Sequence, residues 1–149
     1  MIKLIAKNPT AYHNYTISET FEAGIVLTGT EIKSIRNGKV NIKDTYITIK
    51  NGEAFIYGMH ISPYEFGNIN NKDPLRTRKL LVHKREIDRL YASIKQKGVS
   101  LVPIELYFNN NNKVKVKVGM GKGKKLYDKR EDMAKRDAEM KIDRALKNR

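Results

Sequence analysis

The fold of this chain is decided by the stretch from Val99 to Val118, which reads VSLVPIELYF, NNNN and KVKVKV in three successive parts. The first part, residues 99–108, is rich in β-branched and aromatic side chains, which is typical of a strand. Pro103 within it indicates an edge position or a bulge, because proline cannot donate to a sheet. Four asparagines then form a turn, and Lys113 to Val118 alternates strictly between charged and apolar residues. The stretch therefore predicts two strands joined by a turn.

Similar patterns extend toward the N-terminus. Apolar and polar residues are interleaved from Tyr15 to Leu27, which predicts a strand, with a bend or bulge at Ala23-Gly24. Residues 46–49 and 54–57 predict a hairpin, because Asn51-Gly52 between them suits the positive φ angles of a tight turn.

Two helices are expected among these strands. A short one begins at Thr28 or Thr30, either of which can cap it, and stops at Asn37-Gly38. A longer one ends at Gly98 and places four apolar residues on one face with the spacing i, i+3, i+4, i+7: Ile87, Leu90, Tyr91 and Ile94.

We therefore expect a mainly β fold with short helices, an OB-fold-like closed barrel, over residues 1–120. Gly119, Gly121 and Gly123 predict a flexible hinge. Residues 121–149 form a basic C-terminal tail with only a thin apolar stripe, too poor to dock on a core. We expect this tail to be disordered when free and to become helical on a partner.

Positive charge is concentrated in the second half of the chain. Residues 1–75 carry 8 Lys/Arg and 7 Asp/Glu, whereas residues 76–149 carry 22 and 9, within a net charge of +14. Such an asymmetry favours a polyanionic partner, and nucleic acid is the class that it indicates.

The sequence also argues against several classes of protein. There is no cysteine for a disulfide, a thiolate metal site or a nucleophile, and the three histidines lack the spacing of a metal motif. No P-loop, nucleophile elbow or dinucleotide fingerprint is present, so we expect neither an enzyme nor a cofactor. No signal peptide or membrane-spanning run is evident, which predicts a cytoplasmic protein without a membrane partner.

Two basic clusters are candidates for RNA contact. Lys113, Lys115 and Lys117 share one strand face at a spacing of roughly 6.5–7 Å, close to the phosphate spacing of a nucleic acid. The alternative is an edge strand that lysines protect from aggregation. Arg76 and Arg78 form the second cluster, because arginine suits phosphate and base stacking; the alternative is a solvated surface. His83 lies nearby and can stack on RNA or hydrogen-bond to it.

Several motifs resemble the small protein B family, the SsrA-binding proteins of bacterial trans-translation. The resemblance runs nearly end to end. It is carried by residues 21–25 (FEAGI), 29–36 (GTEIKSIR), 73–81 (DPLRTRKLL), 121–125 (GKGKK) and 128–130 (DKR).

The resemblance implies an OB-fold protein that binds the tRNA-like domain of transfer-messenger RNA (SsrA) and enters stalled 70S ribosomes with elongation factor Tu. It implies that the tail acts in the decoding centre and the empty mRNA channel, helical there, and that the protein catalyses no covalent step. Carried over by motif, the RNA-binding positions are Glu22, Leu81, His83, where family members often have Asn, and Lys115. The ribosome-acting positions are Gly123, Lys124, Lys125, Asp128, Lys129 and Arg130.

Composition alone supports a generic RNA-binding or ribosomal protein with a disordered extension as well as it supports a member of this family. A nuclease or RNA-modifying enzyme is a third possibility, which would require turnover of RNA by the purified protein.

Overall fold

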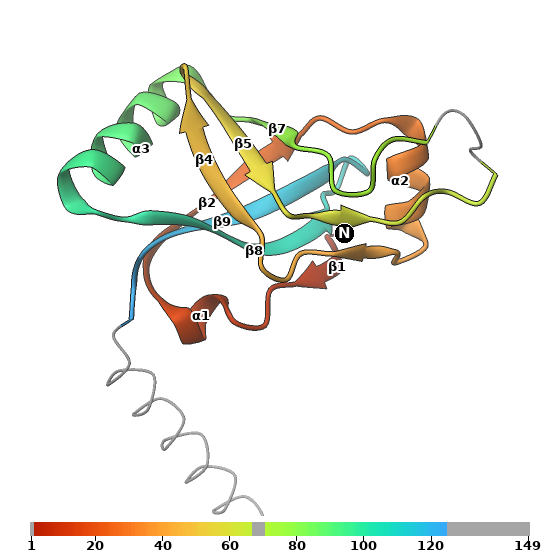
Figure 1. Ribbon diagram of the computed structural model, residues 1–149, viewed down its shortest axis with the longest axis horizontal. Helices are drawn as coiled ribbons and strands as arrows, with labels where there is room; N and C mark the ends of the chain where they lie inside the picture. The colour runs from red at the N-terminus through yellow and green to blue at the C-terminus, as the bar shows by residue number, and fades with distance from the viewer. Residues whose placement is uncertain (1, 67–70, 125–149) are drawn as a thin grey trace, which may run out of the picture.

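The computed structural model describes residues 2–66 and 71–124 (Figure 1). Its strands are β1 (Lys3–Lys7), β2 (Tyr15–Ile25), β3 (Val40–Asn41), β4 (Tyr46–Lys50), β5 (Glu53–Tyr57), β6 (His60–Ile61), β7 (Arg78–Leu81), β8 (Ser100–Phe108) and β9 (Val114–Gly123). Its helices are α1 (Ala11–Asn14), α2 (Gly29–Arg36) and α3 (Lys84–Lys97). The expected mainly β fold with short helices is confirmed. Of the expected tail, residues 121–149, the part from 125 to 149 lies outside the described residues, and with it the expected disorder and helicity.

The main sheet closes on itself through antiparallel pairings. Its strand order is β1-β8-β4-β5-β7-β2-β9, and β9 also pairs with β8, so six strands form a ring and β1 extends it beside β8. The short strands β3 and β6 pair separately. In Figure 1, α2 and α3 lie at opposite ends of this arrangement.

The hydrophobic core draws residues from every strand of the ring and from α2 and α3. The valines of the Lys-Val alternation point into it, since Val114, Val116 and Val118 are at most 8% exposed. The lysines between them therefore face outward, as the period of a strand requires.

Local sequence signals explain the ends of the elements. Thr28 caps α2 through a complete capping box with Glu31, and Gly98 ends α3 in the left-handed conformation, at φ 65°. Asn51 and Gly52 form the predicted turn between β4 and β5, with φ angles of 54° and 75°. These predictions are confirmed.

Two predictions about irregular backbone have different outcomes. The bulge in β2 lies between Ile17 and Glu19 rather than at Ala23-Gly24, where the pairing with β9 runs without a shift in register. The bulge implied by Pro103 is confirmed, because the register of β8 against β9 shifts between Pro103 and Glu105.

The interpretation of the glycines after Val118 as a flexible hinge is wrong for Gly119 and Gly121. Both lie inside β9 and are paired on both sides, with β2 and β8. A Cβ atom at Gly121 would lie 2.6 Å from the backbone oxygen of Thr16. Glycine here permits close packing of two strands, which is the other common reason for glycine in a strand.

Candidate nucleic-acid interface

A row of side chains runs across four neighbouring strands on the outer face of the sheet. Leu81 in β7 pairs with Gly24 in β2, Gly24 pairs with Lys115 in β9, and Lys115 pairs with Tyr107 in β8. Residues directly opposite each other in an antiparallel sheet point to the same face. The pairing therefore brings together two of the predicted RNA-binding positions, Leu81 and Lys115, that are 34 residues apart in the chain.

Gly24 allows the two side chains that flank it to approach each other. A Cβ atom at this position would lie 3.1 Å from the Cβ of Leu81 and 3.6 Å from the Nζ of Lys115. The Lys115 ammonium thus lies over the glycine backbone, beside a leucine that is 55% exposed. An exposed apolar side chain next to a cation suits a nucleotide, which offers an apolar base face and a charged phosphate.

Glu22 occupies the next row on the same face, where it pairs with Lys117, which in turn pairs with Glu105. The Tyr107 hydroxyl donates a short hydrogen bond to Oε2 of the Glu22 carboxylate. Burial and this hydrogen bond raise the pKa of Tyr107. The phenol therefore stays protonated and holds the exposed carboxylate in place, where its remaining lone pairs can accept hydrogen bonds from RNA.

Lys113, just before β9, and Lys115 and Lys117 within it form no ion pair in the described part of the chain, although Lys117 lies opposite Glu22 and Glu105. Arg76, Arg78, Lys79 and Arg89 are among the residues that form ion pairs in the described part of the chain. Because β9 pairs with β2 and with β8, it is not an edge strand, and protection of an edge no longer explains Lys115 and Lys117.

Two hollows lie beside this row of side chains, and Leu81 lines both of them. One, of about 300 Å³, is lined by Gly24, Leu81, Lys113 and Lys115 together with residues of α2. The other, of about 480 Å³, is lined by Lys79, Leu81 and His83 among others. His83 is exposed and also caps α3, where its Nδ1 accepts a hydrogen bond from the backbone N–H of Arg85 at 3.3 Å. Asparagine is one of the preferred N-cap residues, so its side chain can make the same kind of contact at this position.

The structure contradicts the prediction that Arg78 contacts RNA. The residue is 1% exposed, and its Nη2 lies 2.6 Å from Oε2 of Glu31. Its guanidinium also donates to the backbone oxygens of Met59 and Pro74. Arg78 therefore joins β7 to α2 and to the chain around Met59, and its donors are used inside the protein.

Arg76 is half-buried and shares the same carboxylate, with 2.5 Å between its Nη2 and Oε1 of Glu31. Burial by itself would raise the pKa of Glu31, but hydrogen bonds from Arg76, Thr28 and Arg78 outweigh it and hold this pKa below its ordinary value. The two arginines and the glutamate form a structural cluster behind the interface, which charge counting could not distinguish from a binding cluster.

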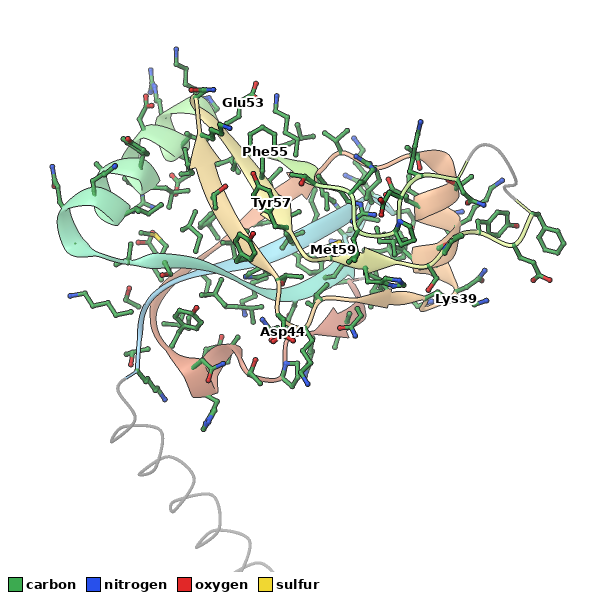
Figure 2. The ribbon with its side chains drawn as sticks, in the orientation of Figure 1. Lys39, Asp44, Glu53, Phe55, Tyr57 and Met59 are labelled. Atoms are coloured by element: carbon green, nitrogen blue, oxygen red, sulfur yellow. The ribbon has the colours of Figure 1, made fainter. Side chains whose placement is uncertain are left out.

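Two aromatic side chains of the hairpin between β4 and β5, Tyr46 and Tyr57, contact each other. Glu53, Phe55 and Tyr57 follow each other along β5 (Figure 2), and Tyr57 stacks on Tyr46 of β4 with 5.1 Å between the ring centroids. One face of the Tyr57 ring is therefore already covered by protein.

The start of the predicted tail is part of the fold. Gly123 ends β9 opposite Tyr15, and the backbone N–H of Lys124 donates to the oxygen of Asn14 at 2.8 Å. Both of these ribosome-acting candidates thus lie beside α1, away from the row through Lys115. The other four, Lys125, Asp128, Lys129 and Arg130, lie outside the described residues.

The sequence did not single out two residues of this surface: Tyr107, which was one of several tyrosines that could stack on RNA, and Arg36. The signal for Tyr107 was its position in β8, but only the strand register places it opposite Lys115. Arg36 follows Ile32 by four residues on α2, so both side chains lie on one helix face, and both line the hollow beside Lys115.

Neither a metal site nor a membrane-spanning helix is found in residues 2–66 and 71–124. Within these ranges, no group of three or more histidine or carboxylate side chains could hold a metal ion. No helix there is long and apolar enough to cross a membrane.

The fold and this surface together define a class: a mainly β protein with a sheet face whose lysines form no ion pair among the described residues, of the kind that holds a nucleic-acid backbone. The family model described as "SmpB protein" matches residues 5–148, and the chain belongs to this family. The family resemblance read from the motifs is thereby confirmed.

Relatives and a solved structure agree with this assignment. The "SsrA-binding protein" of Acetivibrio thermocellus is 65% identical over 145 residues, which cover 97% of this chain and 94% of the relative. That of Moorella thermoacetica is 53% identical over 148 residues, 99% of this chain and 96% of the relative. A solved structure reported as "tmRNA-SmpB: a journey to the center of the bacterial ribosome" is 46% identical, with a TM-score of 0.66, and covers 81% of this chain and 85% of its own.

Proposed function

We propose that this protein binds the tRNA-like domain of transfer-messenger RNA and delivers this RNA to stalled ribosomes for trans-translation. The tail acts in the decoding centre and the empty mRNA channel. The protein works in the cytoplasm, with elongation factor Tu in the delivery complex, and catalyses no covalent step. Family membership and the names of the relatives support this proposal.

One structural observation carries the proposal. Glu22, Leu81 and Lys115 come from three different strands, and the sheet register gathers them on one exposed face. This face combines a held carboxylate, an apolar side chain and unpaired cations. Such a mixture can bind phosphates and also read sugar hydroxyls or base edges, as specific recognition of a structured RNA requires.

Competition binding tests the choice of RNA. The labelled tRNA-like domain is displaced from the full chain by itself or by an unrelated structured RNA of the same length, at physiological salt. The proposal predicts that the unrelated RNA competes far more weakly. Equal competition would favour a generic RNA-binding protein instead.

Substitution of Lys115 tests the site. Lys115→Ala is expected to weaken binding of the tRNA-like domain and to reduce the slope of log K against log salt by about one phosphate contact. Lys50→Ala is the matched control, because Lys50 is an exposed lysine at the end of β4 and lines neither hollow. If Lys115→Ala and Lys50→Ala had the same slope of log K against log salt, Lys115 would not be part of the RNA interface.

Truncation tests the division of labour between the folded part and the tail. The chain should end after Lys124, because the hydrogen bond from its backbone N–H to Asn14 belongs to the fold. The truncated protein is expected to keep its affinity for the tRNA-like domain and to lose tagging of nascent chains on stalled ribosomes. Equal loss of both would contradict a two-part protein.

A further inference from the structure

A third hollow, of about 440 Å³, adjoins the one that Lys115 lines. Lys3, Arg36, Phe108 and Asn112 line it. Arg36 and Asn112 also line the hollow of about 300 Å³ that contains Lys115. The two hollows therefore adjoin at Arg36 and Asn112, and we refer to them together as the groove, which reaches from Leu81 past Lys115 to Lys3 of β1.

Arg36 presents an available guanidinium at this junction. It is the last residue of α2, is exposed, and forms no ion pair or hydrogen bond through its side chain within residues 2–66 and 71–124. Arg76, Arg78 and Arg89, in contrast, each have a glutamate partner. The capping box and the Glu31 cluster fix α2, so the position from which Arg36 extends is rigid although its side chain is unpaired.

The opposite wall of the groove is equally well fixed. Asn109 organises the tip between β8 and β9, because its Oδ1 accepts hydrogen bonds from the backbone N–H groups of Asn111 and Lys113, both at 2.9 Å. Asn112 follows in the left-handed conformation, at φ 59°, and its backbone N–H donates to the oxygen of Asn109. In the described part of the chain its side-chain amide has no hydrogen-bond partner.

The charge of the groove has one sign. Lys3, Arg36, Lys113 and Lys115 line it, and no carboxylate is among the described residues that do. None of these four cations takes part in an ion pair within the described residues. Uncompensated cations along a groove favour a ligand with a row of negative charges, as an RNA backbone has.

We propose that Arg36 binds a backbone phosphate of the RNA, next to the phosphate bound by Lys115, and that Asn112 hydrogen-bonds to the adjoining sugar or base edge. This extends the RNA-binding surface across the end of α2 to Lys3. The proposal rests on the proposed function, because the RNA is the one bound at Lys115. The planar guanidinium can bind a phosphate through two parallel hydrogen bonds, which the ammonium of lysine cannot do.

Two substitutions of Arg36 distinguish the contribution of its charge from that of its planar guanidinium. Arg36→Ala is expected to bind the tRNA-like domain of transfer-messenger RNA roughly tenfold more weakly, with a salt slope lower by about 0.9. Arg36→Lys is expected to keep the salt slope and to recover only part of the affinity. Lys50→Ala serves again as the control for an exposed cation outside the groove.

Phosphate ethylation interference identifies the phosphates that the protein contacts. If Arg36 had a purely structural role, its substitution would not change this pattern. Ethylation of the phosphate bound by Arg36 should impair binding of the unmodified protein and have no further effect on Arg36→Ala. An interference pattern that is the same for both proteins, or a salt slope of Arg36→Ala equal to that of Lys50→Ala, would overturn the inference.

If the proposed function is wrong, the experiments give a different result from the one that overturns the role of Arg36. If the unmodified protein shows no preference for the tRNA-like domain over an unrelated structured RNA, the choice of RNA is wrong. The salt slope of Arg36→Ala, measured on either RNA, still decides whether Arg36 binds a phosphate.

Discussion

Replacing Glu31 by glutamine should destabilise the fold strongly, because Glu31 is the shared anion of two arginines. The residue is 4% exposed, and its two oxygens lie 2.5 Å from Nη2 of Arg76 and 2.6 Å from Nη2 of Arg78. Oε1 also accepts a hydrogen bond from the backbone N–H of Thr28 at 2.9 Å. A glutamine amide oxygen can still accept from Thr28, so the capping box is preserved and the charge is removed.

The size of the destabilisation follows from the positive charge of Arg78, which stays buried when residue 31 is no longer an anion. Arg78 has a fully buried side chain, and burial, the largest effect on it, lowers its pKa, which reflects the cost of keeping the charge away from water. Removing one partner of a buried ion pair typically costs about 3–5 kcal/mol, because the remaining charge is uncompensated. For a chain of this size, each kcal/mol lowers the melting temperature by roughly 2–4 °C, so we expect a decrease of about 10 °C.

The same contact predicts how stability depends on pH. The pKa of Glu31 is lower in the folded protein than its ordinary value of 4.5. A carboxyl group with a lowered folded pKa contributes stability above its unfolded pKa and loses this contribution as the pH falls through the folded value. The unmodified protein should therefore lose this contribution in acid below about pH 4.5, and Glu31→Gln should lack this part of the acid sensitivity.

Thermal unfolding followed by circular dichroism at neutral pH measures the effect. Glu19→Gln is the matched control, because Glu19 also binds an arginine, Arg89, but the pair is exposed and solvent screens it. We expect no detectable change in melting temperature for the control. If Glu31→Gln had the same melting temperature as Glu19→Gln, the argument that Glu31, Arg76 and Arg78 form a buried, mutually dependent cluster would be refuted.

Three further predictions concern the strands and the cap of α3. Gly121→Ala should cost about 1–3 kcal/mol in denaturant unfolding, because its Cβ would collide with neighbouring backbone, whereas Gly123→Ala, with nothing within 4 Å, should unfold like the unmodified protein. His83→Ala should cost about 1 kcal/mol through loss of the cap and His83→Asn should not, and equal melting temperatures for the two would exclude a capping role. Tyr107→Phe should leave Glu22 without its hydrogen-bond donor and weaken binding of the tRNA-like domain, measured by fluorescence anisotropy, while far-ultraviolet circular dichroism remains unchanged; unaltered affinity would show that the phenol does not position this carboxylate.

Short-range patterns predicted the individual elements because their causes are local. The alternation from Lys113 to Val118 correctly indicated which side chains are buried and which face outward. Asn51-Gly52, the Thr28 cap and Gly98 correctly marked a turn and two helix ends, since each depends on backbone geometry within a few residues. The N-terminal strand β1 was not predicted, because its five residues show no clear period.

Residues whose role depends on a distant partner were beyond such reasoning. Arg76 and Arg78 appeared to be a basic cluster for RNA, and only the packing of β7 against α2 places Glu31 between them. Gly119 and Gly121 appeared to be a hinge, and only the neighbouring strands explain why a side chain does not fit there. In each case the deciding contact joins residues far apart in the chain.

The sequence by itself determined the mainly β class, the positions of most strands and helices, the concentration of positive charge and, through its motifs, the family. Tertiary structure alone decided which of these charges remain available for RNA. Strand register gathered Leu81, Lys115 and Glu22 on one face, the packing of α2 placed Arg36 at the hollow that Leu81 and Lys115 line, and Arg78 is buried. The physical reason is that a cation costs much free energy to bury unless an anion accompanies it, and whether one does depends on long-range packing that no local pattern contains.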